Sequence, residues 1–250
     1  ACGPASKCRI GDRHYFIALP KGYDGQSRIP ALIFAHGLQG SGLEISKNPR
    51  LRAVADKLGI AFVAVKSAGT SWSIANSPTA YKRSEKDVLA YFDAVKKDII
   101  RRFPIDPKRI VVTGASAGGM ATWALACRRS REFAAFIPMS GTFWSPEPRR
   151  CRGPATNIIH FHGSKDRTVP LQGRFVRGAQ HGSVTKSLKM YGRYGRFSNP
   201  KSRNFPGLNC KVSRNRKGKI LNFCLYDGGH SFRASNLESA WRMLQSAGQI

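Results

Sequence analysis

The stretch that decides the fold is Gly114-Ala115-Ser116-Ala117-Gly118. It follows the apolar, β-rich run 109–113 and precedes the run 119–126, which is typical of a buried helix. A G-x-S-x-G pentapeptide between a strand and a helix holds its serine on a sharp turn, and its glycines let strand and helix approach closely. The pattern therefore indicates a nucleophilic serine, Ser116. The alternative is a glycine-rich turn whose serine only caps the helix.

A nucleophilic serine needs a base, and the base needs an acid that orients it. In folds with this turn the chain order is serine, acid, histidine. Asp166 lies in a turn after the strand-like run 157–162, where α/β sheets carry functional side chains. His230 follows a glycine pair after the apolar run 220–226. We therefore predict a triad of Ser116, Asp166 and His230.

Two further histidines lie near these segments. His162 precedes the acid loop and is expected to pack beside it as a structural residue. His181 lies in a basic stretch without clear periodicity and is expected at the surface.

The oxyanion of an acyl-transfer reaction is bound by two backbone N–H groups. One is expected from Ala117, the residue after the candidate nucleophile. The other is assigned to Leu38, in the glycine-rich loop 36–42 that follows the apolar run 31–35.

Periodicity along the chain predicts an α/β fold. The expected strands lie near residues 13–19, 31–36, 60–66, 110–114, 135–139, 157–162 and 220–226. The expected helices are 49–58, 84–103, 117–129 and 235–247. Residues 1–250 are expected to form a single domain. The segment 171–219 is expected to be a basic, irregular excursion or a short cap.

The spaced motifs resemble a known family. They are His36-Gly37-x-x-Gly40, Ile105-Asp106-Pro107-x-Arg109-Ile110, Gly114-x-Ser116-x-Gly118-Gly119-Met120, His162-Gly163-x-x-Asp166-x-x-Val169-Pro170 and Gly229-His230. From Tyr15 to Trp241 the chain is similar to the secreted polyhydroxybutyrate depolymerase-like and feruloyl-esterase-like α/β-hydrolases. The resemblance implies the α/β-hydrolase fold, a mostly parallel sheet with helices on both faces. It also implies the triad roles of Ser116, Asp166 and His230, and as substrates polyesters, feruloyl sugars or acetylated xylans.

The charge is extreme. Lys and Arg number 42 against 14 Asp and Glu, which gives a formal net charge of +28. Between Arg167 and Tyr226 there is no acidic residue at all. Because such charge opposes compaction by self-repulsion, and solubility needs far less, it indicates a polyanionic partner. No base-reading module is visible, so an anionic polymer substrate is favoured over specific nucleic acid.

Within the family, this charge profile resembles the bacterial poly(aspartic acid) hydrolases. That resemblance implies endo-hydrolysis of β-linked aspartyl amides. One alternative is a polyhydroxybutyrate depolymerase or a feruloyl or acetylxylan esterase with a neutral substrate. Another is a polyanion-binding protein with a vestigial triad.

Several side chains are candidates for substrate contact, each with an alternative in the core or on the solvated surface. The aromatic ones follow expected strand ends: Trp72, Phe143 and Trp144. The basic ones lie in or after the acid loop and could hold substrate carboxylates: Lys165, Arg167, Arg174 and Arg177.

The cysteines form an even set without metal-ligand spacing: Cys2, Cys8, Cys127, Cys151, Cys210 and Cys224. They are expected as disulfides of an exported, processed protein, extracellular or periplasmic. Local spacing favours Cys2–Cys8 and Cys210–Cys224, which leaves Cys127–Cys151. The mechanism implies no cofactor and no metal, and no run is long enough to span a bilayer. The sequence leaves open whether the chain is a monomer or a homodimer.

Overall fold

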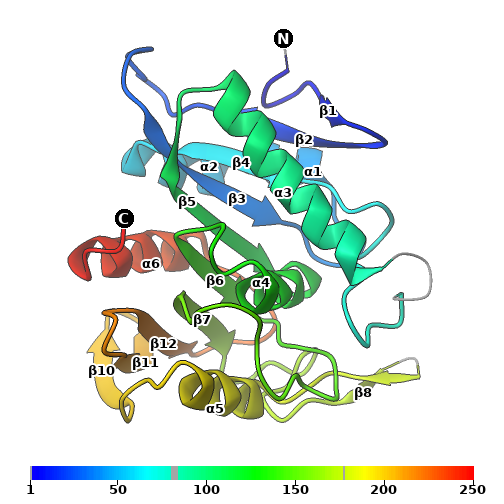
Figure 1. The fold of residues 1–250 in the computed structure, drawn as a ribbon, viewed down its shortest axis with the longest axis vertical. Helices are drawn as coiled ribbons and strands as arrows, with labels where there is room; N and C mark the ends of the chain where they lie inside the picture. Colours follow the sequence, from blue (N-terminus) through cyan, green and yellow to red (C-terminus); the bar gives the residue numbers. More distant parts are fainter. Residues whose placement is uncertain (1, 80–83, 177) are drawn as a thin grey trace.

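The computed structural model describes residues 2–79, 84–176 and 178–250. The strands of this part form a ten-stranded sheet, in the order β1-β2-β4-β3-β5-β6-β7-β12-β11-β10, and a hairpin, β8–β9 (Figure 1). The six central strands, β4, β3, β5, β6, β7 and β12, run parallel to one another. The two strands at each edge run antiparallel to their neighbours. The strands are β1 (Cys8–Ile10), β2 (Arg13–Ala18), β3 (Ile29–Ala35), β4 (Ala61–Val65), β5 (Ile105–Ala115), β6 (Ala135–Met139), β7 (Asn157–Gly163), β8 (Phe175–Val176), β9 (Ala179–Gln180), β10 (Lys201–Phe205), β11 (Leu208–Arg214) and β12 (Ile220–Tyr226).

Helices cover both faces of this sheet (Figure 1). Helices α3 (Glu85–Arg102), α4 (Ala117–Arg128) and α5 (Val184–Tyr194) pack on one face. Helices α1 (Gly42–Lys47), α2 (Pro49–Leu58) and α6 (Ala234–Ser246) pack on the other. Because both faces are covered, every residue of β4, β6 and β7 is buried, and these strands are largely apolar. The architecture is the α/β-hydrolase fold that the sequence predicted.

Each strand and helix expected from the periodicity is present. The largest difference in bounds is at β5, which begins at Ile105 rather than near residue 110. Its first residue pairs with Ile29 before the register shifts, so a short irregular ladder precedes the apolar core of the strand.

The expectation of an irregular segment at 171–219 is wrong for much of its length. It contains the hairpin β8–β9, helix α5 and strands β10 and β11. Strand β10 was missed because its side chains are exposed and polar, so no apolar alternation marks it. Helix α5 was missed because its buried side includes Ser187 between Val184 and Met190, which weakens the hydrophobic period.

Three disulfides join the six cysteines, in the pairs that local spacing favoured: Cys2–Cys8, Cys127–Cys151 and Cys210–Cys224. The last joins directly opposed residues of the antiparallel pair β11–β12, whose strands are connected by a turn at 215–218. The second ties the end of α4 to the segment before β7.

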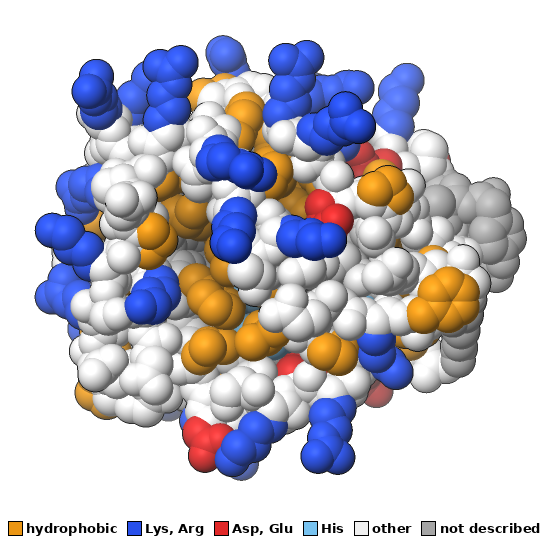
Figure 2. Space-filling view, turned by 90° about the horizontal axis from the view of Figure 1, so that it is seen from below, with side chains coloured by type: hydrophobic (Ala, Val, Ile, Leu, Met, Phe, Trp, Pro, Cys, Tyr) orange, Lys and Arg blue, Asp and Glu red, His pale blue; other side chains and the backbone are white. Residues whose placement is uncertain are grey.

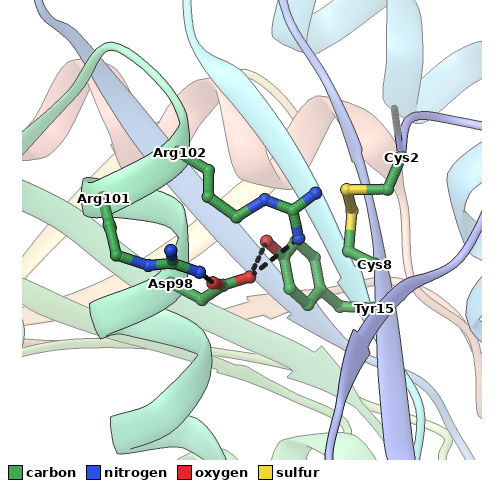
Figure 3. The surroundings of a disulfide bond; sticks show 6 residues. All are labelled: Cys2, Cys8, Tyr15, Asp98, Arg101 and Arg102. Atoms are coloured by element: carbon green, nitrogen blue, oxygen red, sulfur yellow. Dashed lines mark hydrogen bonds and ion pairs between the residues drawn. A yellow bond between two sulfur atoms is a disulfide. The ribbon is translucent and has the colours of Figure 1, made fainter.

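The first disulfide closes the N-terminal segment on itself, next to Tyr15 and an ion-pair cluster on α3 (Figure 3). Beside it, the Tyr15 hydroxyl donates a hydrogen bond to Asp98 Oδ2 at 2.8 Å. Asp98 also accepts from Arg101 at 2.6 Å and from Arg102 at 3.2 Å. The edge strands β1 and β2 are thus fastened to a helix of the core.

Candidate active site

The turn between β5 and α4 has the geometry of a nucleophile elbow. Ser116 has φ +57° and ψ −121°, a conformation that costs free energy in any residue with a Cβ. The close approach of strand and helix requires glycine on both sides of it. A Cβ on Gly118 would lie 1.9 Å from the Ala35 carbonyl oxygen, and one on Gly114 would lie 2.5 Å from the Gly118 carbonyl carbon.

The Ser116 side chain does not cap the helix that follows it. The backbone is fixed on both sides, since the Ser116 N–H donates to the Met139 carbonyl at 2.9 Å and its own carbonyl accepts from the Met120 N–H at 2.9 Å. Its hydroxyl makes no capping hydrogen bond. The alternative of a merely capping serine is therefore not supported.

Asp166 and His230 meet at the carboxyl ends of neighbouring parallel strands. His230 Nδ1 lies 2.8 Å from Asp166 Oδ2. The loops that carry them are joined through the backbone, because the Lys165 N–H donates to the Gly228 carbonyl at 2.9 Å. A Cβ at Gly163 would lie 2.3 Å from the Gly229 carbonyl oxygen, so this contact requires glycine.

The Asp166 carboxylate is buried and accepts several hydrogen bonds. Its Oδ1 accepts from the Thr168 N–H at 2.9 Å and the Val169 N–H at 2.8 Å, and its Oδ2 also lies 3.3 Å from His162 Nε2. Burial alone would raise the pKa of Asp166. The hydrogen bonds from His162, His230 and Val169 outweigh burial and hold the pKa well below its ordinary value. The carboxylate is therefore ionised and fixed in orientation.

The structure contains one of the two contacts expected of a triad. Ser116, like Asp166 and His230, follows the carboxyl end of a parallel strand. Within the part of the chain that the structure describes, however, no hydrogen bond joins the Ser116 hydroxyl to His230. Contacts between nucleophile and base are often long in unliganded enzymes and shorten when substrate binds.

A buried chain of side chains continues from Asp166 into the core. Trp123 Nε1 donates to His160 Nδ1 at 2.9 Å, because an indole N–H is only a donor. Neutral His160 must then donate from Nε2 to His162 Nδ1, also at 2.9 Å. His162 in turn donates from Nε2 towards the Val169 carbonyl, at 2.8 Å, and towards Asp166. Burial, together with the neighbouring His162, keeps the pKa of His160 well below its usual value, so His160 is neutral.

His162 therefore has the structural position that was expected for it. The role of His160 was missed. The alternation His160-Phe161-His162 on an apolar strand was its one sequence signal, because both histidines had to lie on the same side of β7.

The loop after β3 is held by His36. The Ser67 N–H donates to His36 Nε2 at 3.1 Å, so Nδ1 carries the proton and donates to the Gly37 carbonyl at 2.6 Å. Burial lowers the pKa of His36 to about 4, which keeps this arrangement neutral. In a trans peptide the N–H points opposite to the carbonyl, so the Leu38 N–H points away from His36.

Both expected oxyanion donors are available. Within the described residues, neither the Leu38 N–H nor the Ala117 N–H donates a hydrogen bond. Gly37 brings the loop to the elbow, since a Cβ there would lie 3.6 Å from Ser116 Cβ.

The expectation that His181 lies at the surface is wrong. Its ring is buried and packs edge-on against Trp144, with centroids 4.4 Å apart. Burial and the charges of Arg174 and His230 lower its pKa to about 4. His181 is therefore neutral, and its electrostatic interactions with His230 and Asp166 indicate that its ring lies near these two residues. Tertiary contacts alone bring it there, which is why the local composition misled.

Two of the aromatic candidates for substrate contact are buried, and one is partly exposed. Trp72 is buried and donates from Nε1 to the His36 carbonyl at 2.9 Å, so it braces the loop rather than contacting substrate. Phe143 is buried against Trp123 and also belongs to the core. Trp144 is partly exposed and remains a candidate for substrate contact.

Three of the four basic candidates are exposed: Lys165, Arg167 and Arg174. Lys165 forms a surface ion pair with Asp227 at 2.6 Å, and Arg174 donates to the Thr168 carbonyl at 2.7 Å. Arg167 is exposed, and Arg177 lies outside the described residues. Arg174 therefore braces the acid loop through one of its five N–H donors.

The chain is similar to several known proteins. Residues 50–144 match the prolyl oligopeptidase family. The chain is 25% identical over 231 residues to feruloyl esterase B of Piromyces equi, covering 87% of this chain and 42% of that protein. It is 28% identical over 237 residues to probable feruloyl esterase C of Aspergillus terreus, covering 88% and 77%. This chain is a serine hydrolase.

The fold of the hydrolase is shared with solved esterases. An acetyl xylan esterase from Aspergillus awamori superposes with a TM-score of 0.67, covering 100% of this chain and 97% of that one at 12% identity. At that identity the likeness concerns the fold alone. The hydrolase spans less than half the length of the Piromyces relative. The comparisons favour an enzyme over a binding protein with a vestigial triad.

Proposed function

We propose that the hydrolase cleaves carboxylic esters through an acyl-enzyme on Ser116, with feruloyl or acetyl esters of polysaccharides as the substrate class. The observation that carries the mechanism is the 2.8 Å contact between His230 Nδ1 and Asp166 Oδ2, at the sheet edge where the elbow serine also lies. The relatives named feruloyl esterases, aligned over most of the chain, support the substrate class.

In the proposed mechanism Ser116 Oγ attacks the ester carbonyl while its proton moves to His230 Nε2. Asp166 holds the imidazole in the tautomer with the proton on Nδ1 and stabilises the imidazolium. The Leu38 and Ala117 N–H groups bind the oxyanion of the tetrahedral intermediate. The bond to the leaving alkoxide breaks as His230 returns the proton, which releases an alcohol. Water then attacks the acyl-enzyme by the same route and releases the acid.

The substrate class is tested with parallel substrates. Methyl ferulate, acetylated xylan, 4-nitrophenyl acetate, polyhydroxybutyrate and poly(aspartic acid) would be incubated with the hydrolase and with Ser116→Ala as a matched blank. We expect feruloyl or acetyl ester cleavage that is absent from the variant. Equal rates for both proteins on every ester would overturn the proposal.

A second candidate substrate is an anionic polymer, with endo-hydrolysis of the β-amide bonds of poly(aspartic acid) as its specific form. The supporting observation is the net charge of +28, with no acidic residue between Arg167 and Tyr226. Because long-range attraction is screened by salt, kcat/KM on poly(aspartic acid) should fall steeply between about 0.02 and 0.5 M salt. A neutral ester should show no such fall. No cleavage of poly(aspartic acid), or equal salt sensitivity for the neutral ester, would exclude this candidate.

We also propose that the chain acts as one catalytic domain outside the reducing cytosol. The three disulfides support an oxidising compartment. None of the helices in the described part of the chain is long and apolar enough to cross a bilayer.

A further inference from the structure

A groove lies between helix α6 and the antiparallel edge of the sheet. Its volume is about 640 Å³. One wall is the last half of α6, including Arg242 and Met243, and the other is formed by strands β10 and β11. Its floor is apolar and is formed by Phe205, Val212 and Ile220.

The groove lies apart from the triad and runs along the strand direction. It is lined by Ile220, at the start of β12, whereas His230 follows the end of that strand. Seven residues of strand span about 20 Å. At its other end the groove is lined by Phe205, opposite Leu208 and therefore close to the carboxyl end of β12. An extended chain in the groove would thus point towards the edge of the sheet that carries the triad.

Three cations line the groove without an acidic partner. Lys201 and Arg203 lie two residues apart on β10 and share one face of the strand, and Arg214 lies on β11. All three are exposed, and no described acidic residue forms an ion pair with them. A fourth cation, Arg242, is paired with Glu238 at 2.9 Å and is not needed for the argument.

The surroundings reinforce this positive field. Figure 2 views the end of the molecule where α5 and β10 lie, and Lys and Arg side chains stand around it with few acidic ones between. With no acid from Arg167 to Tyr226, nothing on β10, β11 or α5 neutralises the groove. Clefts lined by one sign of charge focus the field and attract the opposite charge.

Protection of an edge strand explains only part of this arrangement. Basic side chains on the outermost strand β10 discourage pairing with another chain. Arg214, however, lies one strand in from the edge, on β11, where it pairs with Ile220 of β12 and its carbonyl accepts from the Ser198 N–H at 3.1 Å. An apolar floor beneath unpaired cations is suited to a ligand with both a hydrocarbon backbone and negative charges.

We propose that this groove binds an extended polycarboxylate chain, as a docking site separate from the triad. Carboxylates accept charge-assisted hydrogen bonds from Lys and Arg, and the polymer backbone covers the apolar floor. Single-stranded nucleic acid is disfavoured because its bases stack on aromatic platforms, and Phe205, the aromatic side chain that lines the groove, is already covered by the Arg203 guanidinium at 5.3 Å. The proposal goes beyond the proposed function, since binding here does not depend on which bond is cleaved.

The test compares two triple variants with equal loss of charge. Lys201→Gln/Arg203→Gln/Arg214→Gln neutralises the groove. Lys186→Gln/Lys189→Gln/Arg193→Gln removes three exposed cations from α5, on the opposite face of the sheet. Binding of fluorescein-labelled poly(glutamic acid) would be measured by anisotropy at about 0.15 M salt, where long-range effects are damped. Hydrolysis of 4-nitrophenyl acetate and the melting temperature would be measured for both variants.

We expect the groove variant to weaken binding by about tenfold or more and the α5 variant by no more than about threefold, because contact and not net charge carries the affinity. Both should melt like the parent and hydrolyse the small ester at its rate. Equal weakening in the two variants would overturn the proposal in favour of diffuse attraction. A labelled oligothymidylate that binds more tightly than the polycarboxylate, with the same loss in the groove variant, would overturn it in favour of nucleic acid. If no ester is hydrolysed while the groove variant alone loses binding, the proposed function fails and the docking site stands.

Discussion

His162 Nε2 lies 3.3 Å from Asp166 Oδ2, the same carboxylate oxygen that His230 Nδ1 contacts at 2.8 Å. Two imidazoles thus share one acceptor, and only one of them, His230, is partly exposed to solvent. The other, His162, is held by a chain of hydrogen bonds that runs through His160 and ends at Trp123. We infer that these hydrogen-bonded side chains hold Asp166 in position. We also infer that the His162 hydrogen bond makes the Asp166 carboxylate a weaker acceptor for His230.

Removal of that chain should change the pH profile of the enzyme. In His162→Asn the carboxylate loses a donor, so it stabilises the His230 imidazolium more strongly, and the acidic limb of kcat/KM should move to higher pH. The rate at its maximum should fall by about tenfold, since Asp166 is less well oriented. Trp123→Phe, which removes the indole N–H together with part of the buried ring, should shift the limb in the same direction by less. The limb is measured on a small ester, and an unchanged limb in both variants would exclude this role for His162.

The strained conformation of Ser116 predicts an opposition between stability and activity. The free energy of unfolding of Ser116→Gly should exceed that of Ser116→Ala by about 1 kcal/mol, because glycine adopts φ +57° without a Cβ penalty. Both variants should lose turnover by about 10³-fold or more. Stability is measured by urea unfolding followed by circular dichroism. Equal stability of the two variants would show that the turn is not strained.

The buried histidines predict a loss of stability in mild acid. Burial lowers the pKa of both His36 and His181 to about 4, whereas the unfolded chain has values near 6.5. Between pH 4 and 6.5 these histidines are protonated in the unfolded state but not in the folded state. The free energy of unfolding is therefore highest above pH 6.5 and falls as the pH drops towards 4. Each histidine contributes roughly 2–3 kcal/mol to that fall.

The check is the free energy of unfolding in urea at pH 7.5, 5.5 and 4.5. Asp166 should not contribute over this range, because its pKa is lowered and its stabilising effect is lost only below about pH 4. His181→Phe should show a shallower fall than the parent. A free energy that is independent of pH would contradict the burial of neutral histidines.

The disulfide between Cys127 and Cys151 should matter for the fold more than for the chemistry. It closes a loop with a sequence separation of 24 and anchors the end of α4, the helix that begins at the elbow. Cys127→Ser/Cys151→Ser should lower the free energy of unfolding by about 3 kcal/mol. Ester turnover well below the melting temperature should be unchanged. The parent protein should show no free thiol to alkylating reagents without reduction, and two or more reactive thiols would contradict the bridges.

The sequence was sufficient where chemistry and secondary structure coincide. Ser116, Asp166 and His230 each follow an apolar run, so their place at one edge of a parallel sheet could be predicted. His181 and Trp72 could not be placed, because distant segments rather than local composition bury their rings. The exposed strand β10 carries no apolar pattern, so neither it nor the groove that it lines could be predicted.

The central claim is that Ser116 is the residue that becomes acylated. A fluorophosphonate probe, followed by peptide mass spectrometry, tests this most directly. The expected result is one adduct on Ser116, absent from Ser116→Ala and formed at least about 10²-fold more slowly in His230→Ala, because the imidazole must accept the serine proton. An adduct on another residue, or no adduct at all in the folded parent protein, would contradict the claim.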